Sequence, residues 1–385
     1  MSGKLTRRQL AALASGAMMA EAQGQPPPSE YTGALDGLEG KVNLKAFDPV
    51  AWSLDRYNSA PMKLRFQASN RKQAEAWQKK LREKVRELVG GTPQPRPVSA
   101  TTLETRDFGR YRREKFIFES RPGSFVLGYL LTPSNGAGPR PAVICLPGHG
   151  RGVDDIVGID DKGAHRTDKA GYQHDFAIQV AEQGMAAVAI EQMAFGCRRD
   201  GRTKKGGLGR SACQPVAGAA LLLGETMVGW RVHDVMRTVD WIGTRPDLDA
   251  SRIGVTGISG GGTITVFSAA LDTRIKAAFA SGYLNTFRDS IYSLAHCIDN
   301  YVPGILNWAE MYDVAGLIAP RPFFAESGTK DDIFPIAAFR ESFARVMKVY
   351  ETFGAAGQLD HEIFEANHSW HGVRGIPFLA KHLGA

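Results

Sequence analysis

The sequence has few cysteines, no long hydrophobic run and no dense cluster of one charge. Its four cysteines show neither a C-x-x-C metal spacing nor the density of a disulfide-rich scaffold. No window is apolar over the roughly 20 residues that a spanning helix needs, so we expect no membrane span. The formal charge of +7 is not gathered into a basic face interleaved with aromatics, so we expect no nucleic-acid partner.

Phosphate-binding and metal-binding motifs are also lacking. The glycine-rich stretch "GVTGISGGGT" at residues 254–263 does not continue with the Lys-Ser or Lys-Thr pair that a phosphate loop requires. No His, Asp and Glu cluster has the spacing of a metal site. We therefore expect no cofactor and no metal. The sequence predicts neither the oligomeric state nor whether Cys197, Cys213 and Cys297 form a disulfide.

The N-terminal residues have the pattern of a targeting sequence. Arg7 and Arg8 precede a short apolar stretch at residues 10–20, and a small-x-small site ends at Ala22. This segment resembles a bacterial twin-arginine export signal. We expect cleavage near Ala22 and a periplasmic or extracellular mature protein.

Helical and strand patterns then follow in an informative order. Residues 70–91 contain apolar residues at near-helical spacing and end in two glycines, which predicts a helix. From "PAVICLPGHG" onward, buried strand patterns alternate with helical ones. This alternation predicts a mostly parallel, doubly wound sheet with helices on both faces. We divide the chain into an export signal (1–22), an N-terminal helical extension (23–100) and a catalytic domain (101–385).

The glycine-rich stretch fits G-x-S-x-G at residues 257–261, placed between a strand pattern and a helix pattern. In a parallel sheet, catalytic groups lie at the carboxyl ends of the strands. The pattern therefore predicts that Ser259 is a nucleophile on a sharp turn. The glycines at 257 and 261 would let strand and helix approach closely.

A serine nucleophile needs a base, and the base needs an orienting acid. His368 lies in "NHSWHG", directly after a strand pattern, and His371 is its competitor three residues on. Asp331 and Asp332 both follow the strand pattern "FFAESG", and we choose Asp331. The resulting order Ser, Asp, His is that of the α/β-hydrolases.

Several motifs together carry a resemblance to the α/β-hydrolase superfamily, and within it to the bacterial acetyl xylan esterase and dienelactone hydrolase-like group. These motifs are "CLPGHGRG", "GISGGG", "NYVPG", "LIAPRPFFAESGTKDDIFP" and "NHSWHG". The resemblance runs from about Tyr111 to the C-terminus and implies an α/β-hydrolase fold. The group's G-x-x-D-x-x-[VF]-P pattern falls in register here with Asp331. It also implies oxyanion donors at the backbone N–H groups of His149 and Gly260.

Substrate contacts are less well indicated. The strand "MAAVAIEQ" ends in Glu191, where many relatives have Asp, and we consider Glu191 as a substrate contact. Two insertions, residues 195–223 and 284–320, are expected to be loop-like and to lie over the mouth of the site. Trp308, Tyr301 and Trp370 are candidates for a wall of the substrate site, with core packing as the alternative.

The expected function is that of a secreted serine carboxylesterase that removes small acyl groups, acetyl in particular, from carbohydrate. A glucuronoyl or lactone esterase would use the same three residues. A serine peptidase of the prolyl oligopeptidase type shares the fold, but the N-terminal segment is too short for the propeller of those enzymes. A binding protein without activity would be expected to lack one of the three residues, and none is missing.

Overall fold

The computed structural model describes residues 33–136, 138–293 and 296–385, and its contacts divide the chain into two compact units, Met1–Asn58 and Ser59–Ala385. The predicted export signal, residues 1–22, lies outside the described residues. In the smaller unit, a 3-10 turn, η1 (Leu44–Phe47), is followed by helix α2 (Pro49–Asn58). The strands and the other helices that the structure describes belong to the larger unit.

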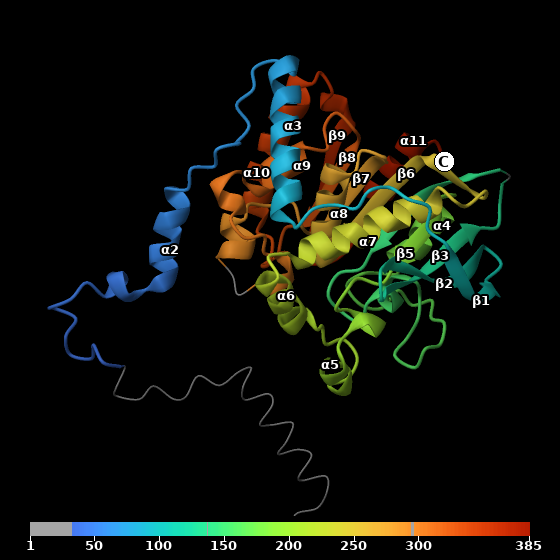
Figure 1. The fold of residues 1–385 in the computed structure, drawn as a ribbon, viewed down its shortest axis with the longest axis horizontal. Coiled ribbons are helices and arrows are strands. Elements are labelled where there is room, and N and C mark those ends of the chain that lie inside the picture. The colour runs from blue at the N-terminus through green and yellow to red at the C-terminus, as the bar shows by residue number, and fades with distance from the viewer. Residues whose placement is uncertain (1–32, 137, 294–295) are drawn as a thin grey trace, which may run out of the picture. The chain divides into compact units, whose positions relative to one another are not determined.

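Among the described residues, nine strands form one sheet at the centre of the larger unit (Figure 1). They are β1 (Ala100–Asp107), β2 (Tyr111–Arg121), β3 (Ser124–Pro133), β4 (Arg140–Leu146), β5 (Ala186–Ile190), β6 (Leu248–Ile258), β7 (Ile275–Ser281), β8 (Phe323–Gly328) and β9 (Leu359–Phe364). Their spatial order is β1-β2-β3-β5-β4-β6-β7-β8-β9. The pairings from β1 to β5 are antiparallel, and those from β5 to β9 are parallel. The predicted mostly parallel sheet is confirmed.

Helices cover both faces of this sheet, as the sequence predicts. Helices α7 (Met227–Ile242) and α8 (Gly260–Leu271) pack on one face, in a core shared with α3 (Arg71–Leu88), α9 (Met311–Gly316) and α10 (Ile336–Thr352). Helices α4 (Phe176–Glu182) and α11 (Gly375–Leu383) pack on the other face. In β4, Ile144 belongs to the first core and Cys145 to the second. A strand buried on both faces explains the continuous apolar run in its sequence.

The two insertions are not loop-like throughout. Residues 195–223 contain η3 (Gly196–Arg198), α5 (Gly201–Lys205) and α6 (Cys213–Leu222). Within 284–320 lie α9 and three single turns, η4 (Arg288–Tyr292), η5 (Ile298–Asn300) and η6 (Ile305–Asn307). Two further turns lie elsewhere, η2 (Val153–Ile156) and η7 (Ala356–Gln358). The expectation of loops fails because short helices without a long apolar period leave little trace in a sequence.

Helix α3 confirms the predicted helix after residue 70. Asn70 caps its N-terminus by accepting a hydrogen bond from the N–H of Gln73 at 3.0 Å. Its apolar side chains, among them Trp77 and Leu81, belong to the core of the larger unit. The contacts therefore divide the chain after Asn58, whereas the sequence places the start of the catalytic domain at residue 101.

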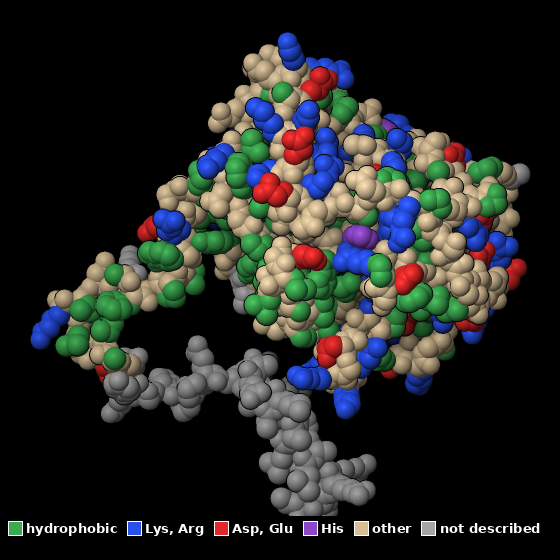
Figure 2. All heavy atoms as spheres, viewed as in Figure 1, with side chains coloured by type: hydrophobic (Ala, Val, Ile, Leu, Met, Phe, Trp, Pro, Cys, Tyr) green, Lys and Arg blue, Asp and Glu red, His purple; other side chains and the backbone are tan. Residues whose placement is uncertain are grey.

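The solvent face of α3 is charged in both signs. Arg71 pairs with Glu75 at 3.0 Å, and Lys84 pairs with Glu87 at 2.5 Å. Figure 2 shows the basic and acidic side chains interspersed over this helix. Among the described residues, no helix is both long enough and apolar enough to cross a membrane.

Two glycines bring β6 and α8 together at the turn that carries Ser259. A Cβ atom at Gly261 would lie 2.0 Å from the carbonyl oxygen of Leu146, and one at Gly257 would lie 2.6 Å from the same oxygen. Both positions thus exclude a side chain because the backbone of β4 is already there. This confirms the close approach that the sequence predicts for the two glycines.

Gly261→Ala is expected to destabilise the fold by more than about 3 kcal/mol, because the added methyl group meets backbone that cannot move independently of the sheet. Urea unfolding of the purified variant measures this loss. The matched control is Gly218→Ala in α6, where a Cβ meets nothing within 4 Å. That control should be stabilised by up to about 1 kcal/mol, since alanine favours helix. Equal stability of the two variants would contradict the steric argument.

Candidate active site

Ser259 occupies a strained turn at the carboxyl end of β6, directly before α8. Its backbone has φ 58° and ψ −123°, a conformation that residues with side chains rarely adopt. The N–H of Ser259 donates to the carbonyl of Ser281 in β7 at 3.0 Å, which fixes the turn to the neighbouring strand. This is the geometry of a nucleophile elbow, in which the hydroxyl is lifted clear of the sheet.

His368 and Asp331 form a hydrogen-bonded pair next to this turn. His368 follows β9 and Asp331 follows β8, and His368 Nδ1 lies 2.7 Å from Asp331 Oδ2. The other oxygen of Asp331 accepts hydrogen bonds from the N–H groups of Ile333 and Phe334, each at 2.9 Å. The two backbone bonds fix the carboxylate of Asp331, which in turn orients the imidazole of His368. His368 Nε2 makes no hydrogen bond to any residue that the structure describes.

A cavity of about 580 Å³ connects the pair to the serine. Its lining consists of His149, Tyr172, Ser259, His296, Cys297, Ile333 and His368. This volume is in the range of pockets that hold small organic ligands. Ser259 is 6% exposed, so its access to solvent is through this cavity. The fold thus brings together the three residues that the sequence selects from strands β6, β8 and β9.

The competing residues lie elsewhere. His371 does not line the cavity; its ring stacks on Phe364 with centroids 4.5 Å apart, and its Nδ1 lies 3.4 Å from Glu362. Asp332 is exposed. Of these four residues, Asp331 and His368 are the two that form a hydrogen-bonded acid and base, and His368 lines the cavity.

The two expected oxyanion donors lie at the same edge of the sheet. Gly260 is the first residue of α8, so its N–H has no acceptor within the helix. His149 lies in the segment after β4, and its imidazole is 3.2 Å from the position of a Cβ on Gly260. Burial lowers the pKa of His149, but the hydrogen bond and charge of Asp299 outweigh it and raise that pKa to about 9.

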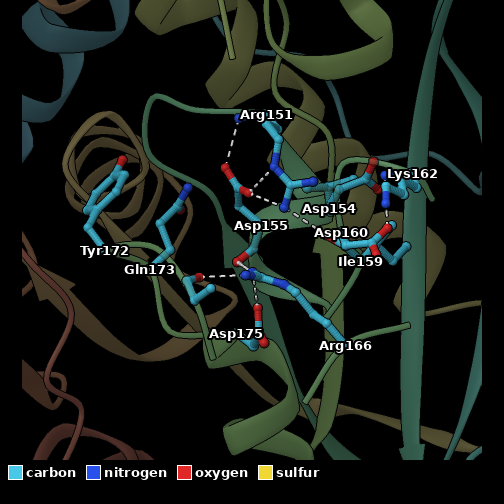
Figure 3. A network of polar contacts seen from close by, with 12 residues as sticks. Arg151, Asp154, Asp155, Ile159, Asp160, Lys162, Arg166, Tyr172, Gln173 and Asp175 are labelled. Atoms are coloured by element: carbon cyan, nitrogen blue, oxygen red, sulfur yellow. Dashed lines mark hydrogen bonds and ion pairs between the residues drawn. The ribbon is translucent and has the colours of Figure 1, made fainter. Parts of the chain in front are cut away.

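A polar network that includes Arg151, Asp155 and Arg166 holds the segment that also carries Tyr172 (Figure 3). Arg151 donates to Asp155 from its backbone at 2.8 Å and from its guanidinium at 2.7 Å. The buried amide of Gln173 accepts from the N–H of Gly148 at 2.8 Å. The Tyr172 hydroxyl donates to the carbonyl of His149 at 2.7 Å. These bonds fix the backbone of this segment next to Ser259, and with it the orientation of the His149 N–H group.

The four sequence candidates for the substrate site, Glu191, Tyr301, Trp308 and Trp370, do not line the cavity. Glu191 is buried, accepts from the N–H of Val153 at 3.1 Å, and has a pKa that burial raises to about 8. Trp308 packs against the core, with the ammonium of Lys84 4.4 Å from its ring centroid. Trp370 is 1% exposed and belongs to the second core. For the tryptophans the core alternative is correct, and Glu191 is a buried structural carboxyl.

Four residues of the cavity were not selected from the sequence as site residues: Tyr172, His296, Cys297 and Ile333. Tyr172 and Cys297 come from segments without a recognisable motif. Ile333 alone stood close to a selected residue, two positions after Asp331. The position of Ile333 could have been inferred from its neighbour, whereas the others depend on how two long segments fold back over the sheet.

Glu326 is a second buried carboxyl beneath the site. It lies in β8, two residues before the last residue of the strand, is 0% exposed, and accepts from the N–H groups of His371 and Gly372, each at 2.9 Å. Burial raises the pKa of Glu326 to about 7, although these hydrogen bonds oppose the shift. The carboxyl thereby ties the loop of His368 to the sheet.

Glu326 is expected to make stability fall as the pH rises from about 4.5 to about 7. In this window the unfolded chain has lost the proton of Glu326 while the folded chain retains it, so the free energy of unfolding decreases, by about 3 kcal/mol at most. Above pH 7 the effect is constant. The measurement is urea unfolding of the wild type and of Glu326→Gln across this range, because the glutamine cannot titrate. A pH-independent difference between the two would contradict the raised pKa.

Comparison with known proteins assigns this chain to a family. The sequence profile of the Abhydrolase family matches residues 58–345, about three quarters of the chain. The matched region contains Ser259 and Asp331 and ends before His368. The protein YtaP of Bacillus subtilis (strain 168), which is named as a hydrolase without established activity, is 27% identical over 282 residues. That alignment covers 71% of this chain and 88% of YtaP.

Solved structures share the fold at low identity. A Bacteroides fragilis NCTC 9343 protein that is provisionally named an acetyl xylan esterase superposes with a TM-score of 0.69 at 22% identity, over 83% of this chain and 82% of that one. A glucuronoyl esterase from Solibacter usitatus gives a TM-score of 0.60 at 16% identity, over 81% and 94% of the two chains. With the parallel sheet, the two-sided helical layers and the profile match, these findings show that the chain belongs to the Abhydrolase family and has the α/β-hydrolase fold.

Proposed function

We propose that the protein is a serine carboxylesterase in which Ser259 is the nucleophile, His368 the general base and Asp331 the acid that orients the base. The observation that carries this proposal is the 2.7 Å hydrogen bond between His368 and Asp331, formed at the cavity that Ser259 also lines. The strained turn at Ser259 supports the same assignment, because such strain persists where function requires it.

In this mechanism His368 Nε2 takes the proton of the Ser259 hydroxyl as its oxygen attacks the ester carbonyl carbon. The carbonyl oxygen becomes an oxyanion, for which the N–H groups of Gly260 and His149 are the proposed donors. The tetrahedral intermediate then collapses, the alcohol leaves with the proton from His368, and an acyl-serine remains. Water attacks this ester by the same steps, which releases the carboxylic acid and restores Ser259.

The proposed substrates are small acyl esters, acetyl esters in particular, on carbohydrate. The cavity is moderate in volume, and its lining includes three histidines and a tyrosine, whose polar atoms could bind the hydroxyl groups of a carbohydrate. Two of the structural neighbours are named for acetyl xylan and for glucuronoyl esters. We also propose that the protein is exported, on the basis of the N-terminal sequence pattern.

The test is a panel of esters given to the purified protein, with Ser259→Ala as the control in every assay. The panel holds 4-nitrophenyl esters from acetate to octanoate, acetylated xylo-oligosaccharides and a methyl ester of glucuronic acid. We expect kcat/KM to fall as the acyl chain lengthens and acetate to be released from the oligosaccharides. Faster turnover of the glucuronate ester would identify a glucuronoyl esterase instead. Cleavage of peptides without cleavage of esters would contradict the proposal.

A further inference from the structure

We propose that His149, Cys213, Cys297 and Asp299 bind one zinc ion in a tetrahedral site beside the catalytic cavity. One atom of each side chain is available as a ligand, and these four atoms all lie within 4.8 Å of one another. His149 and Cys297 also line the cavity, whereas Cys213 and Asp299 are buried behind them. The sequence offers no metal-binding spacing because the ligands come from three distant segments.

The separations match those of a zinc tetrahedron. Zinc bonds of about 2.3 Å to sulfur and 2.0 to 2.2 Å to nitrogen or oxygen place neighbouring tetrahedral ligands roughly 3.3 to 3.8 Å apart. Asp299 Oδ2 lies 3.4 Å from His149 Nε2 and 3.3 Å from Cys213 Sγ. The distance from Cys213 Sγ to His149 Nε2 is 3.7 Å. Three of the six distances between ligand atoms therefore already suit a zinc tetrahedron.

The chemistry of the ligand set favours zinc over other common cations. Two cysteine sulfurs with an imidazole nitrogen exclude a preference for Mg²⁺ or Ca²⁺, which take oxygen ligands. Four protein ligands fill the tetrahedron and leave no position for water or substrate, so the ion would be structural rather than catalytic.

Buried groups around the cluster orient it and balance its charge. Arg231 is 2% exposed and donates to Asp299 Oδ2 at 2.5 Å and to Cys213 Sγ at 3.5 Å. Asn300 Nδ2 donates to the other oxygen of Asp299 at 2.9 Å. Two thiolates, one carboxylate and Zn²⁺ carry a net charge of −1, which the guanidinium of Arg231 neutralises. Such outer partners are what hold metal ligands in place.

The position of the ion suggests what it does. Cys213 begins α6 in the first insertion, Cys297 and Asp299 lie in the second, and His149 follows β4. One ion would therefore fasten both insertions to the segment that carries an expected oxyanion donor. Loss of the ion is expected to loosen the cavity wall and lower the melting temperature, while the triad residues keep their own contacts.

A disulfide between Cys213 and Cys297 is the alternative use of the same thiols. The two alternatives differ in the zinc content and in the number of free thiols per chain. The full-length protein, expressed with zinc supplied and then dialysed, is analysed for zinc by mass spectrometry. Its thiols are titrated in denaturant with a strong chelator and without reductant. We expect about one zinc per chain and four titratable thiols. Two thiols and no zinc would replace the proposal with a disulfide.

Variants locate the ion. Cys213→Ser and Cys297→Ser should each reduce the zinc content at least tenfold, whereas Cys197→Ser, an exposed cysteine in the same insertion as Cys213, should retain it. Cobalt added to the zinc-free wild type should give the near-ultraviolet band of cobalt–thiolate bonding, which requires no variant to fold. Four thiols with neither zinc nor a cobalt band would overturn the proposal. Zinc content unchanged in both cluster variants would also overturn it.

Discussion

Replacing Ser259 by alanine is expected to lower kcat for ester hydrolysis by about 10⁶-fold, the scale seen when a triad serine is removed from a protease. Without the hydroxyl no acyl-enzyme forms, and His368 has no proton to accept from position 259. The fold should remain, because the turn depends on the glycines on either side of the serine. Steady-state hydrolysis of 4-nitrophenyl acetate measures the loss.

The matched control for this variant is Ser268→Ala. Ser268 lies in the same helix that Ser259 precedes, is fully buried, and its hydroxyl has no hydrogen-bond partner among the described residues. We expect kcat near that of the wild type for this control. A fluorophosphonate probe should label the wild type and Ser268→Ala but not Ser259→Ala. Hydrolysis by Ser259→Ala at the wild-type rate would mean that another residue is the nucleophile.

Asp331→Asn is expected to lower kcat by about 10⁴-fold, as the corresponding change does in a serine protease triad. The amide keeps the shape of the side chain, but its NH₂ group cannot accept the Nδ1 proton of His368 as the carboxylate does. The imidazole is then held in the wrong tautomer for removing the serine proton. KM should change little, because Asp331 does not line the cavity.

Asp332→Asn is the comparison that makes this result specific. The two residues are adjacent and of the same type, but Asp332 is exposed whereas Asp331 is 5% exposed and bonded to His368. We expect Asp332→Asn to have nearly the wild-type kcat. Similar losses in the two variants would mean that the loop as a whole had been disturbed. A loss confined to Asp332→Asn would transfer the role of the acid to that residue.

The parts of the site that could be predicted are those fixed by local geometry. Ser259 sits in a pattern that combines a strand, a turn with obligatory glycines and a helix, so its position relative to the sheet follows from its neighbours in sequence. Asp331 follows the buried strand β8 and His368 follows the edge strand β9, and parallel strands end at one edge of the sheet. The sheet, the helix after residue 70 and the meeting of these three side chains could therefore be inferred without coordinates.

The parts that could not be predicted depend on contacts between distant segments. Trp370 lies two residues from His368, yet its ring turns into the core, where it stacks on Phe176 with centroids 4.2 Å apart. Glu191 directly follows β5, a position from which a side chain can contact substrate, but its carboxyl group packs against Gly152 and Gly196. Cys213 and Cys297 are 84 residues apart in sequence and meet only because both insertions fold over the same edge.

The positive φ of Ser259 has an evolutionary consequence. Its backbone conformation suits glycine and disfavours a residue with a side chain, at a cost of about 1 to 3 kcal/mol. Ser259→Gly should therefore raise the free energy of unfolding while ending hydrolysis. The substitution that ends activity at this position thus also stabilises the fold, and only continued selection for turnover retains the serine. In a lineage released from that selection, drift would be expected to place glycine there and leave a more stable, inactive descendant with the same fold.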